Sequence, residues 1–167
     1  RRAFTRVLPV HDVTVRGVGI RCVAPLHQLG TYLAMVDWEQ REPEVLDWID
    51  AMTPGSVFFD VGSNFGTETL YASLKAGGPA RIIAFDCEFS GSYNLAANLL
   101  LNRIDNVENR FAAVGETEGW VAVPENLNYL WVDGHPKYAQ AMKTVPRISI
   151  DRVVADTGCV PTYVKVD

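Results

Sequence analysis

The chain has 167 residues, a mass of 18.5 kDa, and 48% hydrophobic and 21% charged residues, which is typical of one soluble globular domain. Its net charge of -5 and pI near 5.2 argue against nucleic-acid binding, which needs clustered lysine and arginine to neutralise phosphates. No apolar run approaches the roughly 20 residues that span a bilayer, and the start lacks an initiator methionine and an apolar signal region. We therefore expect a cytoplasmic protein without a membrane partner, trimmed from a longer chain.

Cysteines and histidines are few and lie far apart. A zinc site needs ligands at short, clustered spacings, and these residues form no such cluster in the sequence. We expect free thiols in a reducing compartment and no bound metal. The residues are Cys22, Cys87, Cys159, His11, His27 and His135.

The predicted elements divide a single domain into an N-terminal part, residues 1–53, and a core, residues 54–167. Apolar residues alternate in the first part and then recur on one helical face. Gly17 suits the turn between two strands, and Pro43 suits the first turn of a helix. The strands are expected at residues 13–16 and 19–23, and the helix at residues 44–52.

The sequence pattern of the core predicts alternating strands and helices. Short apolar segments predict buried strands, and longer segments that end at glycine or proline predict helices. This alternation predicts an α/β fold, with a mostly parallel sheet and helices on both faces. The strands are expected at residues 57–60, 81–85 and 110–114, and the helices at residues 67–76 and 90–102.

The pattern fades between residues 116 and 145 and then returns. An edge strand is expected at residues 119–123, the rest of the stretch is expected to be irregular, and its aromatic residues are expected to pack onto the sheet. Residues 148–154 and 162–166 resume the pattern, the second as a fourth buried strand. The aromatic residues are Trp120, Tyr129, Trp131 and Tyr138.

A glycine loop lies between the first core strand and the helix that follows it. Residues 60–67 read Asp-Val-Gly-Ser-Asn-Phe-Gly-Thr, at the carboxyl edge of the sheet, where ligands bind in open α/β folds. Gly62 and Gly66 allow a tight turn and the close approach of a ligand. The N–H groups of Gly66, Thr67 and Glu68 are expected to face that ligand.

The loop departs from the dinucleotide fingerprint. A G-x-G-x-x-G pattern that begins at Gly62 would need glycine where Asn64 and Thr67 stand. The carboxylate of Asp60, just before the loop, suits a cationic ligand better than a pyrophosphate. Two alternatives stay open at this stage: a fragment of an NAD-dependent oxidoreductase, and a non-catalytic binding domain on the same fold.

Asp86 ends the next strand, where an acidic residue accepts hydrogen bonds from ribose hydroxyls in this architecture. Glu88 competes for this role, because a residue two positions further along a strand points to the same side. Together with the glycine loop, Asp86 predicts a ligand that contains a nucleoside.

Several short motifs stand between residue 38 and the end of the chain. They are Phe-Phe-Asp-Val-Gly-Ser-Asn-Phe-Gly at 58–66, Ala-Phe-Asp at 84–86, Leu95 with Asn98, Leu101 with Asn102, Ile-Asp at 150–151 and Val-Lys-Val-Asp at 164–167. This set resembles the FkbM-type S-adenosylmethionine-dependent methyltransferases. The chain departs from that family at Ser63, where alanine is usual, and at Cys87, where proline is usual. It also ends before the Val-Glu-Gly-Xaa-Glu run that follows in the family.

The resemblance implies a Rossmann-like class I methyltransferase fold, apparently truncated at the C-terminus, with S-adenosylmethionine as cofactor. It also implies O-methylation of a hydroxyl group on a sugar, a polyketide or another small metabolite. Asp167 is the predicted catalytic residue, because it ends a strand beside the first one. Lys165 is expected to pair with a nearby acid, and His135 to be an ordinary surface residue; the oligomeric state stays open. The predicted cofactor-binding residues are Asp60, Gly62, Ser63, Asn64, Phe65, Gly66, Asp86 and, near the adenine, Ala113.

Overall fold

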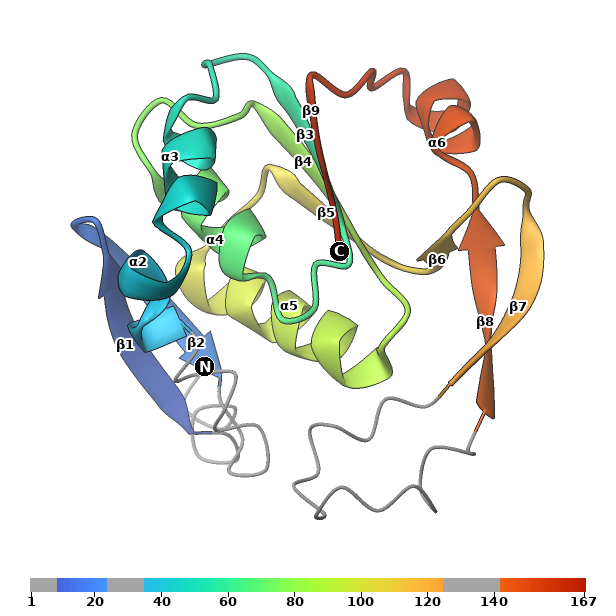
Figure 1. Cartoon of the computed structure of the whole chain (residues 1–167), viewed down its shortest axis with the longest axis horizontal. Coiled ribbons are helices and arrows are strands. Elements are labelled where there is room, and N and C mark those ends of the chain that lie inside the picture. Colours follow the sequence, from blue (N-terminus) through green and yellow to red (C-terminus); the bar gives the residue numbers. More distant parts are fainter. Residues whose placement is uncertain (1–8, 24–34, 125–141) are drawn as a thin grey trace.

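A parallel sheet forms the centre of the computed structural model, which describes residues 9–23, 35–124 and 142–167. Within these residues, the sheet has four strands in the order β5-β4-β3-β9, all paired in parallel (Figure 1). The prediction of an α/β fold with a mostly parallel sheet is therefore confirmed. The strands are β3 (Val57–Val61), β4 (Arg81–Asp86), β5 (Val107–Phe111) and β9 (Tyr163–Val166).

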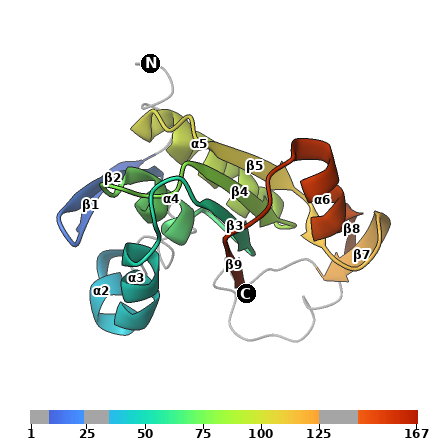
Figure 2. The same ribbon diagram turned by 90° about the horizontal axis from the view of Figure 1, so that it is seen from above.

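Helices cover both faces of this sheet (Figure 2). Successive side chains of a strand point to opposite faces, so Phe58 packs with α3, α4 and α5 whereas Phe59 packs with α6. Because β3, β4 and β5 follow one another in one direction across the sheet, crossovers of one hand place α4 and α5 on the same face. The chain then returns to the opposite edge of the sheet at β9, and this connection places α6 on the other face of the sheet. The helices are α2 (Trp38–Arg41), α3 (Pro43–Asp50), α4 (Thr67–Leu74), α5 (Phe89–Asn102) and α6 (Ile150–Thr157).

An antiparallel hairpin precedes these helices, as predicted. Its strands are β1 (Val10–Val15) and β2 (Val18–Val23), paired over their whole length. The turn residues Arg16 and Gly17 have φ angles of 46° and 81°, as a two-residue hairpin turn requires. The inward side chains of the hairpin share one apolar core with α3, α4 and α5.

The prediction of a third core strand at residues 110–114 is wrong. The strand beside β4 is β5, which begins three residues earlier and is half polar, with glutamate and arginine side chains in ion pairs. The apolar residues that suggested the prediction include β6 (Ala113–Val114), which belongs to a second sheet.

That second sheet has the strand order β6-β8-β7 among the described residues. The edge strand predicted at residues 119–123 is confirmed as β7 (Gly119–Pro124). The predicted end of the irregular stretch, residue 145, is too late in the chain. Strand β8 (Met142–Ile148) already begins at Met142. Residues 148–154 form no single element: Ile148 ends β8, and the Ser149 hydroxyl then accepts a hydrogen bond from the first turn of α6.

The aromatic residues of the 116–145 stretch are only partly described. Trp120 does not pack onto the sheet as expected, because 72% of it is exposed on β7. Tyr129, Trp131, Tyr138 and His135 lie outside the described residues.

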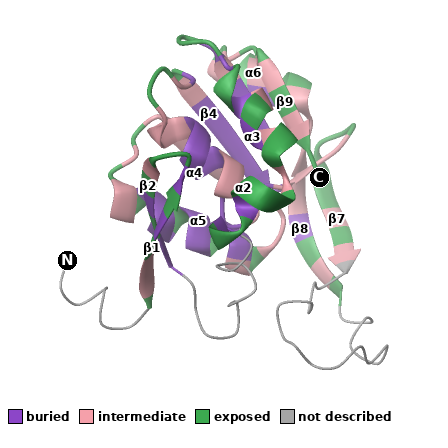
Figure 3. Ribbon diagram, turned by 60° about the vertical axis from the view of Figure 1, so that its left-hand side comes forward, coloured by how far each residue is buried: buried purple, intermediate pink, exposed green. Residues whose placement is uncertain are grey.

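The fourth core strand is confirmed as β9, but the expectation that it is buried is wrong. Val164 and Val166 are 45% and 70% exposed, because β9 is an edge strand that pairs only with β3 in the described part of the chain. Figure 3 shows the contrast with β4, which is buried along most of its length. None of the described helices is both long and apolar enough to cross a membrane.

Candidate functional site

The glycine loop leaves β3 and turns back on itself before α4 begins. Its N–H groups donate to protein oxygens, so the turn is held by its own hydrogen bonds. The expectation that the Gly66 N–H faces a ligand is therefore wrong. The bonds run from Gly62 and Ser63 to the Phe85 carbonyl, both 2.9 Å, from Asn64 to Asp86 Oδ2, 2.5 Å, and from Gly66 to the Ser63 carbonyl, 2.7 Å.

Two glycines let the loop lie directly on α5. Gly66 has a φ of 94°, and a Cβ there would lie 2.4 Å from Cδ1 of Leu95. On α5, a Cβ at Gly91 would lie 2.9 Å from Oδ1 of Asn64 and 3.1 Å from its backbone. Heavier side chains at either position would push the loop away from the helix.

Asp86 connects this loop to the next one. Its carboxylate accepts the N–H groups of Asn64 and Glu88, each at 2.5 Å, and it is 7% exposed. Burial raises the pKa of Asp86, and the two N–H donors act in the opposite direction. Each carboxylate oxygen keeps a further lone pair. The side chain of Glu88, by contrast, forms an ion pair with Lys143 of β8.

Acidic side chains gather around Lys165 on β9. The Lys165 Nζ lies 3.8 Å from Asp60, 3.4 Å from Glu68 and 2.5 Å from Asp167, so its predicted pairing with a nearby acid is confirmed. Burial disfavours the charge of Lys165, but the surrounding carboxylates outweigh burial and raise its pKa. Burial and the nearby charge of Asp60 raise the pKa of Glu68 to about 7.

Asp60 lies behind the loop and is fully buried. Its Oδ2 accepts the hydroxyl of Thr69 at 2.6 Å, whereas its Oδ1 has no hydrogen-bond donor among the described residues. Burial raises the pKa of Asp60, against the effect of Lys165 and Thr69. This carboxylate does not line the cavity described next.

A cavity of about 160 Å³ lies between the loop and α2. Its acidic side chains are those of Glu42, Glu68 and Asp167, and Arg41 is its one basic side chain among the described residues. Asp167 packs against Gly62, and its N–H donates to the Val61 carbonyl at 3.0 Å. The lining residues are Trp38, Arg41, Glu42, Gly62, Ser63, Asn64, Phe65, Thr67, Glu68 and Asp167.

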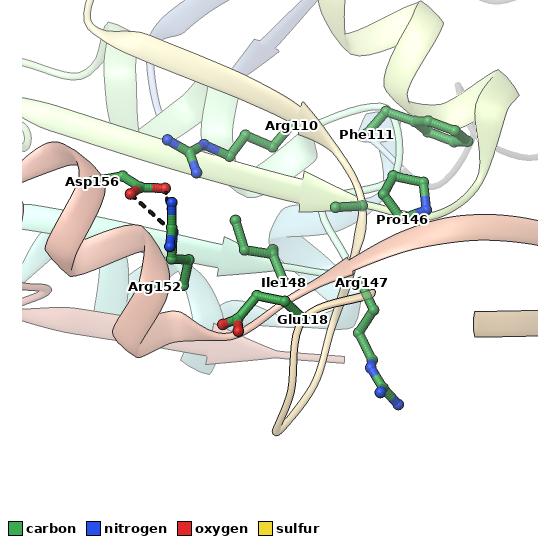
Figure 4. A pocket seen from close by; sticks show the side chains of 9 residues that line it. Arg110, Phe111, Glu118, Pro146, Arg147, Ile148, Arg152 and Asp156 are labelled. Atoms are coloured by element: carbon green, nitrogen blue, oxygen red, sulfur yellow. Dashed lines mark hydrogen bonds and ion pairs between the residues drawn. The ribbon is translucent and has the colours of Figure 1, made fainter. Parts of the chain in front are cut away.

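A larger and more open hollow of about 640 Å³ lies between β5, β8 and α6 (Figure 4). Its guanidinium groups already have partners: Arg110 bonds Glu108, and Arg152 bonds Asp156. Arg147 points away from the others in Figure 4. None of the predicted site residues lines this hollow, so we assign the site to the smaller cavity at the loop.

The structure brings most of the predicted residues together, but not all of them. Gly62, Ser63, Asn64, Phe65 and Asp167 line the cavity, while Gly66, also in the loop, lies against Leu95 of α5. Asp86 adjoins the loop at Asn64 without lining the cavity. Ala113 begins β6, beside Arg147, and lines neither hollow. No group of three or more metal-binding side chains occurs among the described residues.

Sequence reasoning missed the far wall of the cavity. Trp38, Arg41 and Glu42 come from α2 and the residue after it, and nothing in their spacing places them opposite the loop. Glu68 could have been found, since an acid in the first turn of the helix after a glycine loop must lie beside that loop.

No protein-family model matches the chain, and no curated protein does either. Among solved structures, the chain is similar to Trm5b from Pyrococcus abyssi, at 18% identity and a TM-score of 0.39 over 61% of this chain and 28% of that one. It is also similar to M. jannaschii TYW2 in complex with AdoMet, at 18% identity and a TM-score of 0.42 over 59% of this chain and 40% of that one. The chain thus spans less than half the length of either.

Proposed function

We propose that the chain is an S-adenosylmethionine-dependent methyltransferase of the FkbM type, with a Rossmann-like class I fold. One observation carries the proposal: four N–H groups of the loop donate to protein oxygens, and the acidic side chains of Glu68 and Asp167 flank it. A pyrophosphate binds where free N–H groups and positive potential meet. Acidic side chains flank this loop instead, so a ligand with an ammonium or sulfonium group suits its surroundings better.

The same observation disfavours the NAD-dependent alternative. A dinucleotide would place two negative charges beside the acidic side chains of Glu68 and Asp167, where the Asn64 N–H already donates to Asp86. A nucleoside that carries a positive charge avoids this repulsion and still uses the carboxylate of Asp86.

The described residues fit the parts of such a cofactor. Asp86 would hold the ribose hydroxyls with the lone pairs that Asn64 and Glu88 leave unused. Glu68 would hold the ammonium group, and Arg41, across the cavity, the carboxylate. We propose a place near the adenine for Ala113, on the resemblance alone.

S-adenosylmethionine would supply an activated methyl group. The task of the protein is then to position the acceptor hydroxyl and to exclude competing acceptors. Asp167 faces the cavity next to Gly62, with its carboxylate oriented by Lys165 at 2.5 Å. We propose that it lies beside the acceptor hydroxyl and takes its proton.

We propose a small uncharged acceptor, such as a hydroxyl of a sugar or a polyketide. The acidic side chains of Glu42, Glu68 and Asp167 repel a polyanion at the cavity mouth. An uncharged hydroxyl compound meets no such repulsion.

Ligand binding tests the proposal directly. S-adenosylmethionine and S-adenosylhomocysteine should raise the melting temperature, and NAD should not. Stabilisation by NAD alone would exclude the methyltransferase. If the cofactor binds, mass spectrometry of reactions with a panel of hydroxylated metabolites should reveal a product heavier by one methylene unit.

A further inference from the structure

Asn98 lies in the middle of α5, where asparagine is a poor helix former. It is fully buried, and both ends of its side-chain amide are used. Nδ2 donates to the Phe65 carbonyl at 3.1 Å, and Oδ1 accepts the Val23 N–H at 2.7 Å. The poor helix propensity is offset because the side-chain amide bonds two buried backbone groups outside α5, the Val23 N–H and the Phe65 carbonyl.

The bond to Phe65 holds the peptide group between Phe65 and Gly66 in place. Two residues with positive φ angles stand close to this peptide group, Asn64 at 49° and Gly66 at 94°. Glycine at its C-terminal side leaves that peptide free to rotate. Its carbonyl is held by Asn98, and its N–H donates to the Ser63 carbonyl at 2.7 Å.

Asn98 contacts the loop from the same face of α5 as Gly91 and Leu95. Residues 91, 95 and 98 follow the i, i+4, i+7 spacing that aligns side chains along a helix. Each of them meets a different residue of the loop. The contacts are Gly91 with Asn64, Leu95 with Gly66, and Asn98 with Phe65.

We propose that Asn98 is a positioning residue for the cofactor loop, and that it joins the loop and the β1–β2 hairpin into one hydrogen-bonded unit. Its effect on cofactor affinity rests on the proposed function; its effect on the loop does not. Asn102 provides a matched control. It bonds Arg21 of the same hairpin twice, at 2.9 Å and 2.6 Å, and contacts the loop through no hydrogen bond given by the structure.

The test compares Asn98→Asp with Asn102→Ala in the full chain. Asn98→Asp keeps an acceptor for the Val23 N–H and places a carboxylate oxygen against the Phe65 carbonyl. Amide hydrogen exchange in a peptide covering residues 62–66 should accelerate, and the Kd for S-adenosylhomocysteine should rise by about tenfold. Asn102→Ala should leave both within about twofold while exchange in residues 18–23 accelerates.

Equal loop exchange in the two variants would overturn the proposal. If the wild-type chain does not bind S-adenosylhomocysteine, the proposed function fails, and exchange in residues 62–66 still decides the role of Asn98. If Asn98→Asp does not fold, Asn98→Ala, which removes the donor to the Phe65 carbonyl, is measured in its place. Loop exchange unchanged from the wild type in that variant would also contradict the proposal.

Discussion

Glu68 should make the folded chain less stable as the pH rises, and Glu68→Gln is the change that tests this. The carboxyl lies in the first turn of α4, with 12% of the side chain exposed, 3.4 Å from the Lys165 ammonium. Burial and then the charge of Asp60 raise its pKa from 4.5 to about 7, and Lys165 offsets only part of this.

The sign and size of the effect follow from this pKa. A carboxyl with a higher pKa in the folded state binds its proton more tightly there than in the unfolded chain. Its stabilising contribution is therefore complete below pH 4.5 and is lost as the pH rises to about 7. Since one pKa unit corresponds to about 1.4 kcal/mol, the loss is up to about 3 kcal/mol.

Urea unfolding followed by circular dichroism, at about pH 5 and about pH 8, measures this difference. Glutamine cannot ionise, so Glu68→Gln should lose about 2–3 kcal/mol less stability than the wild type between the two conditions. Glu116→Gln, at an exposed loop position, should behave like the wild type. Asp86 titrates in all three proteins and cancels in the comparison, whereas Asp60 interacts with Glu68, so its titration changes along with the Glu68→Gln substitution. Parallel pH profiles for the wild type and Glu68→Gln would refute the reasoning.

Asp86→Ala should weaken binding of S-adenosylhomocysteine by about 1–3 kcal/mol in isothermal titration calorimetry, unless the carboxylate has no part in the site. Gly66→Ala should lower the free energy of unfolding by about 2–4 kcal/mol, because it combines a positive φ with a contact at 2.4 Å from Leu95. Gly77→Ala, with a φ of 71° but 3.6 Å of room, should cost only about 1–2 kcal/mol; equal losses would contradict the packing argument. Thr69→Val removes the hydroxyl donor of a buried carboxylate and should cost about 1–3 kcal/mol; an unchanged melting temperature would show that this bond contributes nothing.

The two central strands of the sheet, β3 and β4, could be predicted because they are mostly apolar on both faces. β3 and β4 read as continuous buried segments, which is how strands covered by helices on both sides appear in a sequence. β5 could not be found in this way. Its polar side chains are accommodated by ion pairs, as in the bond from Arg81 of the neighbouring strand to Glu108 at 2.6 Å. Opposite charges on β4 and β5 meet only when the two strands pair in the observed register, and this register is not visible in the sequence.

The site was predictable where its chemistry is local and unpredictable where it depends on distant partners. The glycine loop and Asp86 stand in short motifs beside strand ends. The buried carboxylate of Asp60 is paired with Lys165, which lies more than a hundred residues further along the chain. Asn98 stands in one of the short motifs, but its structural role could not be predicted, because its two partners come from the hairpin and the loop. Such contacts leave no periodicity in the sequence.

Asp86 cannot be interpreted from a single substitution, because the same carboxylate supports the loop that it is proposed to serve. Alanine at this position removes the acceptor for the N–H groups of Asn64 and Glu88 as well as a ribose contact. Asn98→Asp loosens the same loop and leaves that carboxylate in place. If Asp86→Ala loses more affinity than Asn98→Asp at equal loop exchange, the excess measures the ribose contact. If the two losses match, Asp86 acts only by positioning the loop, and the ribose must be held elsewhere.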